Sequence, residues 1–118
     1  MKYAILIYGE EAEGITPSRL PAEFAPLVAN FEEQVRQAGV LVTSQPLMPT
    51  ETAQTLRNIQ GDVVAIDGPF SETKEQLGGF YLLDCADMDE AMKFARLIPC
   101  APHGSIEVRP VFEPPAGV

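Results

Sequence analysis

Residues 67–80 read DGPFSETKEQLGGF, and this stretch stands between a predicted hairpin and the second of two β–α–β units. Asp67 can accept backbone N–H bonds in an Asx-type turn, and Pro69 fixes the backbone after Gly68. Phe70 is expected to anchor the turn in the core. The two glycines at 78–79 permit close backbone approach or positive φ where the chain re-enters the sheet. The stretch predicts a pinned turn, a polar loop and a returning strand.

The segments before this stretch alternate between strand and helix signals. Pro26 suits a first helical position, apolar residues then recur every three or four positions, and Gly39 suits a left-handed cap. The expected elements are a strand at Lys2–Tyr8, a helix from Ala25 to Ala38, a strand at Val40–Ser44, and a hairpin with strands at Thr55–Gln60 and Asp62–Ile66.

A second β–α–β unit follows the stretch. Asp87 with Glu90 three residues later has the pattern of a capping box, and the helix it opens has an apolar face that runs to Ile98. Strands are expected at Gly79–Cys85 and Ser105–Phe112. This order predicts the α+β class, with a ferredoxin-like βαββαβ core and an extra β-hairpin. Residues 1–112 form the single predicted domain, and residues 113–118 a C-terminal tail.

The predicted sheet has more apolar surface than two helices can cover. The strands at Lys2–Tyr8 and Gly79–Cys85 are apolar on both alternating faces, which is typical of fully buried strands. Two helices of about 11–14 residues cover one face of a four- or five-stranded sheet. We therefore expect a homodimer in which one sheet stacks on another.

Composition limits the classes of partner. The chain has 118 residues, 8 basic and 17 acidic, for a net charge of −9. This charge disfavours nucleic acid and anionic membrane surfaces, because both repel an acidic protein. No apolar run approaches the roughly 18 residues of a membrane span, and no signal peptide is recognised, so we expect a cytoplasmic protein. Cys85 and Cys100 are expected to be buried free thiols, and neither a metal nor a cofactor is predicted.

Two residues are candidate proton acceptors. Asp67 closes a strand beside the polar loop, and His103 is the sole histidine, in a Pro-His-Gly setting before the last strand. Either could act as a general base, with Lys74 or Arg109 stabilising developing negative charge. The alternatives are a plain structural turn at Asp67 and an exposed loop histidine at 103.

Five further side chains are candidate ligand contacts. Glu107 and Arg109 share a strand face and could grip a polar or anionic ligand, or could form an ion pair at an exposed edge. Thr73 and Lys74 belong to the polar loop, where a solvated turn is the alternative. Tyr8 ends the first strand and could equally be a core residue with a tethered hydroxyl.

The residues quoted above resemble a known family. DGPF followed by SETKEQLGGFY, together with the opening MKYAILIYG, AGVL at 38–41 and EVRPV at 107–111, is similar to the DGPF branch of the YCII-related proteins. The resemblance implies a ferredoxin-like protomer that forms a dimeric α/β barrel. Some family members use a His–Asp pair, and one is a cofactor-free dehydrochlorinase. The matching positions here are Val28 and Ile98, so that chemistry is not carried over.

Two functions remain open from the sequence. The first is a barrel that binds a small polar or anionic molecule in a cleft, with or without cofactor-free acid–base catalysis. The second is a non-catalytic regulatory or interaction module. The resemblance suggests an extracytoplasmic-function sigma factor as its partner, because DGPF proteins are often encoded beside such factors.

Overall fold

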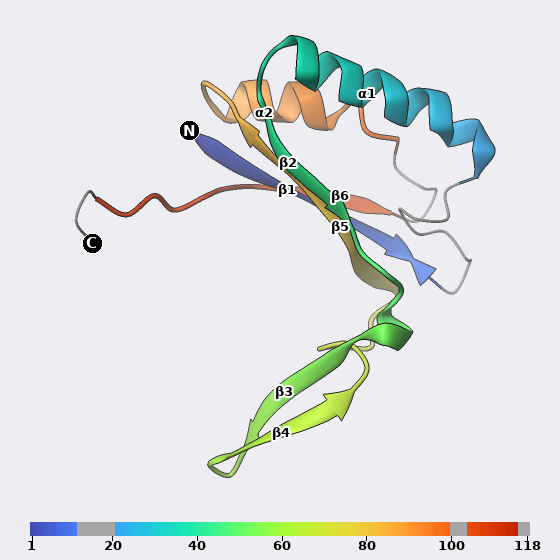
Figure 1. Ribbon diagram of the computed structural model, residues 1–118, viewed down its shortest axis with the longest axis vertical. Helices are drawn as coiled ribbons and strands as arrows, with labels where there is room; N and C mark the ends of the chain where they lie inside the picture. The colour runs from blue at the N-terminus through green and yellow to red at the C-terminus, as the bar shows by residue number, and fades with distance from the viewer. Residues whose placement is uncertain (12–20, 100–103, 116–118) are drawn as a thin grey trace.

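The computed structural model describes residues 1–11, 21–99 and 104–115 (Figure 1). Its elements in chain order are β1 (Lys2–Glu10), η3 (Ala22–Phe24), α1 (Ala25–Gln37), β2 (Leu41–Pro46), η4 (Thr50–Thr52), β3 (Gln54–Ile59), β4 (Asp62–Asp67), β5 (Glu75–Asp84), α2 (Met88–Ala95) and β6 (Ser105–Pro110). The predicted hairpin is β3 and β4, and the predicted α+β class is confirmed.

The main sheet has four strands in the order β2-β5-β1-β6, and all its pairings are antiparallel. This order is that of a ferredoxin-like core, with the β3–β4 hairpin inserted between the second and third core strands. α1 and α2 lie together on one side of the sheet (Figure 1). The sheet therefore has one face covered by helices and one face that no helix of the described residues covers.

The core lies between the helices and the covered face. Its largest fully buried side chains are Phe31 and Val35 from α1, Ile5 from β1 and Leu83 from β5. The Phe31 ring packs edge-on against Tyr81, with 4.7 Å between ring centroids. Ile106 and Val108 of β6 pack against the same cluster, so alternate residues of β1, β5 and β6 all point toward the helices.

The helix termini follow the local signals in the sequence. Pro26 stands in the first turn of α1, and Gly39 beyond its end has φ +71°. At α2 the Asp87 carboxylate accepts the backbone N–H of Glu90 at 2.9 Å, and Glu90 accepts that of Ala86 at 3.1 Å. The first bond is the one predicted for a capping box, whereas the second goes to the residue before the N-cap. The helix α2 ends at Ala95 rather than near Ile98.

The helix-free side of the sheet carries a mixed surface, here called the open face. Strand register places Ala4 opposite Leu82 and Leu6 opposite Phe80, and all four side chains are partly exposed. The same register places Arg109 beside Ala4 and Glu107 beside Leu6. The open face is thus apolar across β1 and β5 and polar along β6.

The β3–β4 hairpin, residues 54–67, projects from the body and is here called the arm. It lies on the side of the sheet opposite the helices (Figure 1). Every residue of β4 is exposed, and so is every residue of β3 except Thr55, which is partly buried. The radius of gyration is 16.2 Å, against about 13.5 Å for a compact chain of this length. The arm contributes to this excess because it extends away from the core.

In the 67–80 stretch one expectation is wrong, and one of the two alternatives at residues 78–79 is excluded. Phe70 is 74% exposed instead of anchoring the core. It lies against the arm, where Arg57 donates to its carbonyl oxygen and stacks 5.3 Å from its ring. Positive φ occurs at Gly68 rather than at residues 78–79. Gly78 instead falls at the break in the β1–β5 register between Ile7 and Tyr8, where the pairing skips it.

The remaining predictions concern cysteines and membranes. Cys85 is a buried free thiol as predicted, and burial raises its pKa to about 11. Cys100 lies outside the described residues. Within the described part of the chain, neither helix is long and apolar enough to cross a membrane.

Candidate functional site

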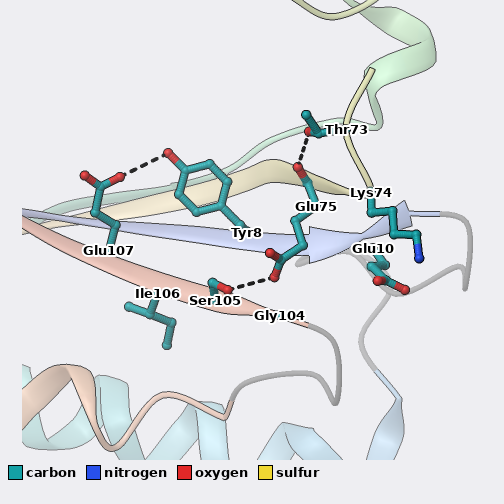
Figure 2. Close-up of a pocket in the computed structure, with 9 residues that line it drawn as sticks. All are labelled: Tyr8, Glu10, Thr73, Lys74, Glu75, Gly104, Ser105, Ile106 and Glu107. Carbon is teal, nitrogen blue, oxygen red and sulfur yellow. Dashed lines mark hydrogen bonds between the residues drawn. The ribbon is translucent and has the colours of Figure 1, made fainter. Parts of the chain in front are cut away.

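An open pocket of about 740 Å³ lies at the edge of the sheet where β1 ends and where β5 and β6 begin (Figure 2). Its described lining residues are Tyr8, Glu10, Thr73, Lys74, Glu75, Gly104, Ser105, Ile106 and Glu107. Three strands that are distant in sequence therefore supply one cluster of polar side chains.

Strand pairing explains why these side chains converge. Tyr8 is directly opposite Ser105 in the β1–β6 pair, and Glu107 is two residues further along the same face. Residues on diagonal positions of neighbouring strands are within reach of long side chains. Figure 2 shows Tyr8 and Glu107 on the side of the strands away from the helices, whereas Ile106 points toward them.

A hydrogen-bonded row runs along the open face from the pocket. The Tyr8 hydroxyl donates to Glu107 Oε1 at 3.4 Å (Figure 2). Arg109 donates from Nε to Glu107 Oε2 at 3.0 Å, and its Nη2 donates to the same oxygen. Glu107 thus uses one carboxylate oxygen for the tyrosine and the other for the guanidinium, which fixes the carboxylate plane.

The environment of this row keeps the tyrosine protonated. Burial raises the pKa of Tyr8, and the negative charge and hydrogen bond of Glu107 raise it further, while Arg109 opposes them. The hydrogen bond to Glu107 is the main cause that raises the pKa of Arg109. At neutral pH the row therefore presents a neutral phenol, which can donate or accept a hydrogen bond.

Two further hydrogen bonds, both to Glu75, lie at the other end of the pocket. The Ser105 hydroxyl donates to Glu75 Oε1 at 2.8 Å, and the Thr73 hydroxyl donates to the Glu75 carbonyl oxygen at 2.6 Å. Glu10 is opposite Glu75 in the β1–β5 pair. Lys74, the residue before Glu75, lies at the rim of the pocket (Figure 2). The described lining carries three carboxylates and one amine, so the pocket is acidic overall.

The structure brings together four of the predicted site residues. Tyr8, Thr73, Lys74 and Glu107 all line the pocket. Arg109 lies outside the lining and reaches the pocket through Glu107.

The two predicted proton acceptors are not among these residues. Asp67 lies at the end of β4 on the arm, where its carboxylate accepts from the Gln54 side chain at 3.2 Å. His103 lies outside the described residues. Among those that are described, no three His, Cys, Asp or Glu side chains are grouped so that they could hold a metal ion.

Sequence reasoning missed Glu10, Glu75 and Ser105 as pocket residues. Ser105 had a usable signal, because it shares the strand face of Glu107 at a spacing of two. Glu75 was assigned to the polar loop, but β5 begins there, four residues earlier than predicted. Glu10 faces it only because β1 extends past Tyr8.

Comparison with known proteins identifies the family of this chain. Residues 1–114 match the YCII-related domain. This chain belongs to the YCII-related family. An uncharacterised protein of Rhizobium meliloti (strain 1021) is 43% identical to it over 116 residues, which cover 94% of this chain and 92% of the relative. The family resemblance predicted from the sequence is thus confirmed, and the narrower DGPF branch is compatible with it.

Proposed function

We propose that this YCII-related protein is a homodimer that binds a small polar molecule in the pocket beside Tyr8. The observation that carries the proposal is the hydrogen-bonded row of Tyr8, Glu107 and Arg109, which runs along the open face into the pocket. A carboxylate held on one side by a guanidinium and on the other by a neutral phenol is preorganised, so little side-chain entropy is lost when a ligand binds.

The pocket chemistry favours a ligand that offers hydrogen-bond donors. Its described side chains include three carboxylates, and the serine and tyrosine hydroxyls can accept as well as donate. Hydroxyl and ammonium groups match this set. An anionic ligand, which the sequence also suggested, would have to rely on Lys74, because Glu107 already engages Arg109.

Acid–base chemistry could use the same row. The Tyr8 hydroxyl is a proton donor directed at Glu107, and Glu107 is a carboxylate that could accept a proton from a bound molecule. These two residues replace Asp67 as the proposed acid–base pair, because Asp67 lies on the arm.

The dimer is proposed from the open face. Ala4, Leu6, Phe80 and Leu82 form its apolar part. The helices of the described residues lie on the other side of the sheet (Figure 1). A second sheet stacked at about 10 Å would bury these side chains. Light scattering should then give a mass near two chains, and a mass near one chain at micromolar concentration would contradict the dimer.

The binding proposal is tested by thermal shift with a panel of polyols, amino alcohols, amines and small carboxylates. A ligand at 100 times its Kd should stabilise the protein by about 2.7 kcal/mol. Tyr8→Phe and Glu107→Gln should each remove most of this shift. The matched control is Tyr81→Phe, which removes a tyrosine hydroxyl from the opposite face of the sheet and should bind like the wild type.

Two results would contradict the binding proposal. One is a panel in which no compound shifts the melting temperature, which would favour the alternative of a regulatory or interaction module with a protein partner such as a sigma factor. The other is a hit whose shift is the same in the wild type and in Tyr8→Phe.

A further inference from the structure

The arm carries apolar side chains that the described part of the chain leaves exposed. Leu56 is 72% exposed and Val63 is 67% exposed. The remaining large apolar side chains exposed on the arm are Ile59, Val64 and Ile66. A two-stranded hairpin alone is at best marginally stable in water, and this one exposes apolar side chains on both of its surfaces. A second surface packed against the arm would stabilise it.

The root of the arm is fixed to the body. The backbone N–H of Leu47 donates to the Gly78 carbonyl at 2.8 Å, and that of Gly68 donates to the Ala53 carbonyl at 2.8 Å. The Glu11 carboxylate accepts the backbone N–H of Thr50 at 3.0 Å. The Leu47 and Thr50 bonds join the connection that leads into the arm to β5 and to the residue after β1, and the Gly68 bond closes the base of the hairpin. The chain that enters the arm is therefore held by the body.

The arm extends from the body on the same side of the sheet as the open face (Figure 1). A second protomer stacked on that face would therefore lie on the side where the arm projects. The dimensions agree, because six residues of strand span about 20 Å and four strands at 4.8 Å spacing are about as wide. One arm is therefore about as long as a partner's sheet is wide.

The contact area also favours a second copy. In projection a four-stranded face covers about 400 Å² and one face of a two-stranded arm about 200 Å². In a two-fold dimer each protomer both contributes an arm and receives one. The total approaches about 800 Å² per partner, the usual size of a stable interface, whereas the sheet alone provides about half of it.

Charge does not oppose this contact. The chain carries a net charge of −9, and two copies repel one another over most of their surfaces. The arm carries only Arg57, Asp62 and Asp67 as charged residues, so it is nearly neutral. It is therefore a segment with which one acidic protomer can approach another.

One surface of the arm is better suited to the contact than the other. Arg57 and Phe70 contact each other on the surface that Arg57 shares with Val64. Leu56 lies on the opposite surface, paired with Ala65, and Val63 is next along it. The most exposed apolar residues of the arm thus lie on the surface without that contact.

We propose that the arm of each protomer packs against the second protomer through Leu56 and Val63, clasping the dimer from outside its stacked sheets. This inference rests on the proposed homodimer. It adds that residues 54–67 are an exchanged clasp rather than a solvated insertion, and that both arms of the dimer make equivalent contacts.

Sedimentation equilibrium on the full chain tests the clasp. Leu56→Asn combined with Val63→Asn should weaken dimerisation tenfold or more. The matched control is Leu27→Asn, an exposed leucine on α1 at 49% exposure, which should leave the dimerisation constant unchanged. Leu6→Asn on the open face tests the stacked sheets separately.

The outcomes separate the two proposals. A wild-type protein that sediments as a monomer overturns both the homodimer and the clasp. A wild-type dimer that Leu6→Asn weakens, but that the double arm variant weakens less than tenfold, overturns the clasp and keeps the stacked sheets.

Hydrogen exchange of the wild-type protein gives a second test that needs no variant. Protection of the amides of residues 54–67 should rise with protein concentration as dimer forms, with the amides of α1 as the internal reference. Arm amides whose exchange is the same in monomer and dimer would overturn the clasp.

Discussion

The two faces of the main sheet each carry a tyrosine bonded to a glutamate that also contacts an arginine. On the covered face, the Tyr81 hydroxyl donates to Glu32 at 3.4 Å, and Arg36 lies 3.9 Å from the same carboxylate. On the open face, Tyr8 donates to Glu107 at the same distance, and Arg109 is the cation.

The surroundings of the two trios differ. The Tyr81 ring packs against Phe31 in the core, and burial raises its pKa to about 12. Tyr8 lines a pocket, with Ser105 opposite it on the neighbouring strand. The same three side-chain types therefore fasten a helix to the sheet on one face and remain accessible to a ligand on the other. Helix coverage decides which role such a trio can have.

The largest expected effect is on the covered face. Phe31→Ala removes a fully buried ring and leaves a cavity against Tyr81, so the free energy of unfolding should fall by about 3–5 kcal/mol. Urea unfolding followed by circular dichroism measures this loss. Leu27→Ala, on the solvent side of the same helix, should change stability by no more than about 0.5 kcal/mol. Similar losses for both variants would contradict the assignment of the core to this face.

The alkaline stability of the protein should depend on Tyr81. Its pKa is about 12 when folded, against 10.0 ordinarily, so the folded state favours the protonated phenol. The stabilisation that this raised pKa gives the folded state is fully present below pH 10 and is lost as pH rises toward 12. The urea midpoint of Tyr81→Phe should therefore fall less between pH 9 and pH 12 than that of the wild type. Equal losses in both proteins would show that Tyr81 ionises alike in the folded and unfolded states.

Most of the fold could be predicted because its signals are local. Pro26, Gly39 and the Asp87–Glu90 box set helix ends through contacts within a few residues, and the structure has each of them. The hairpin was also predictable, since its strands flank a tight turn at Gly61. The place of Phe70 was not, because an aromatic residue after a turn can pack on the core or on an arginine, and the sequence does not show that Arg57 is near.

The site was harder to predict because pairing register assembles it. Tyr8 and Glu107 could be named as candidates, but the register that places them on one face also brings in Ser105 and Glu75. Asp67 was expected near Lys74 because both belong to the 67–80 stretch. The chain leaves the arm within the six residues between them, so proximity in sequence did not predict proximity in the fold.

The smallest expected effect distinguishes the open-face trio from its counterpart. Glu107→Gln removes a negative charge and should lower the pKa of Tyr8, while Arg109→Gln removes an opposing positive charge and should raise it. Each shift is partial, because burial is the larger cause and is unchanged in both variants. Carbon-13 NMR of labelled tyrosine rings can follow each titration, with Tyr81 as the internal reference. Shifts of the same sign in the two variants would show that the row from Arg109 to Tyr8 does not act through charge.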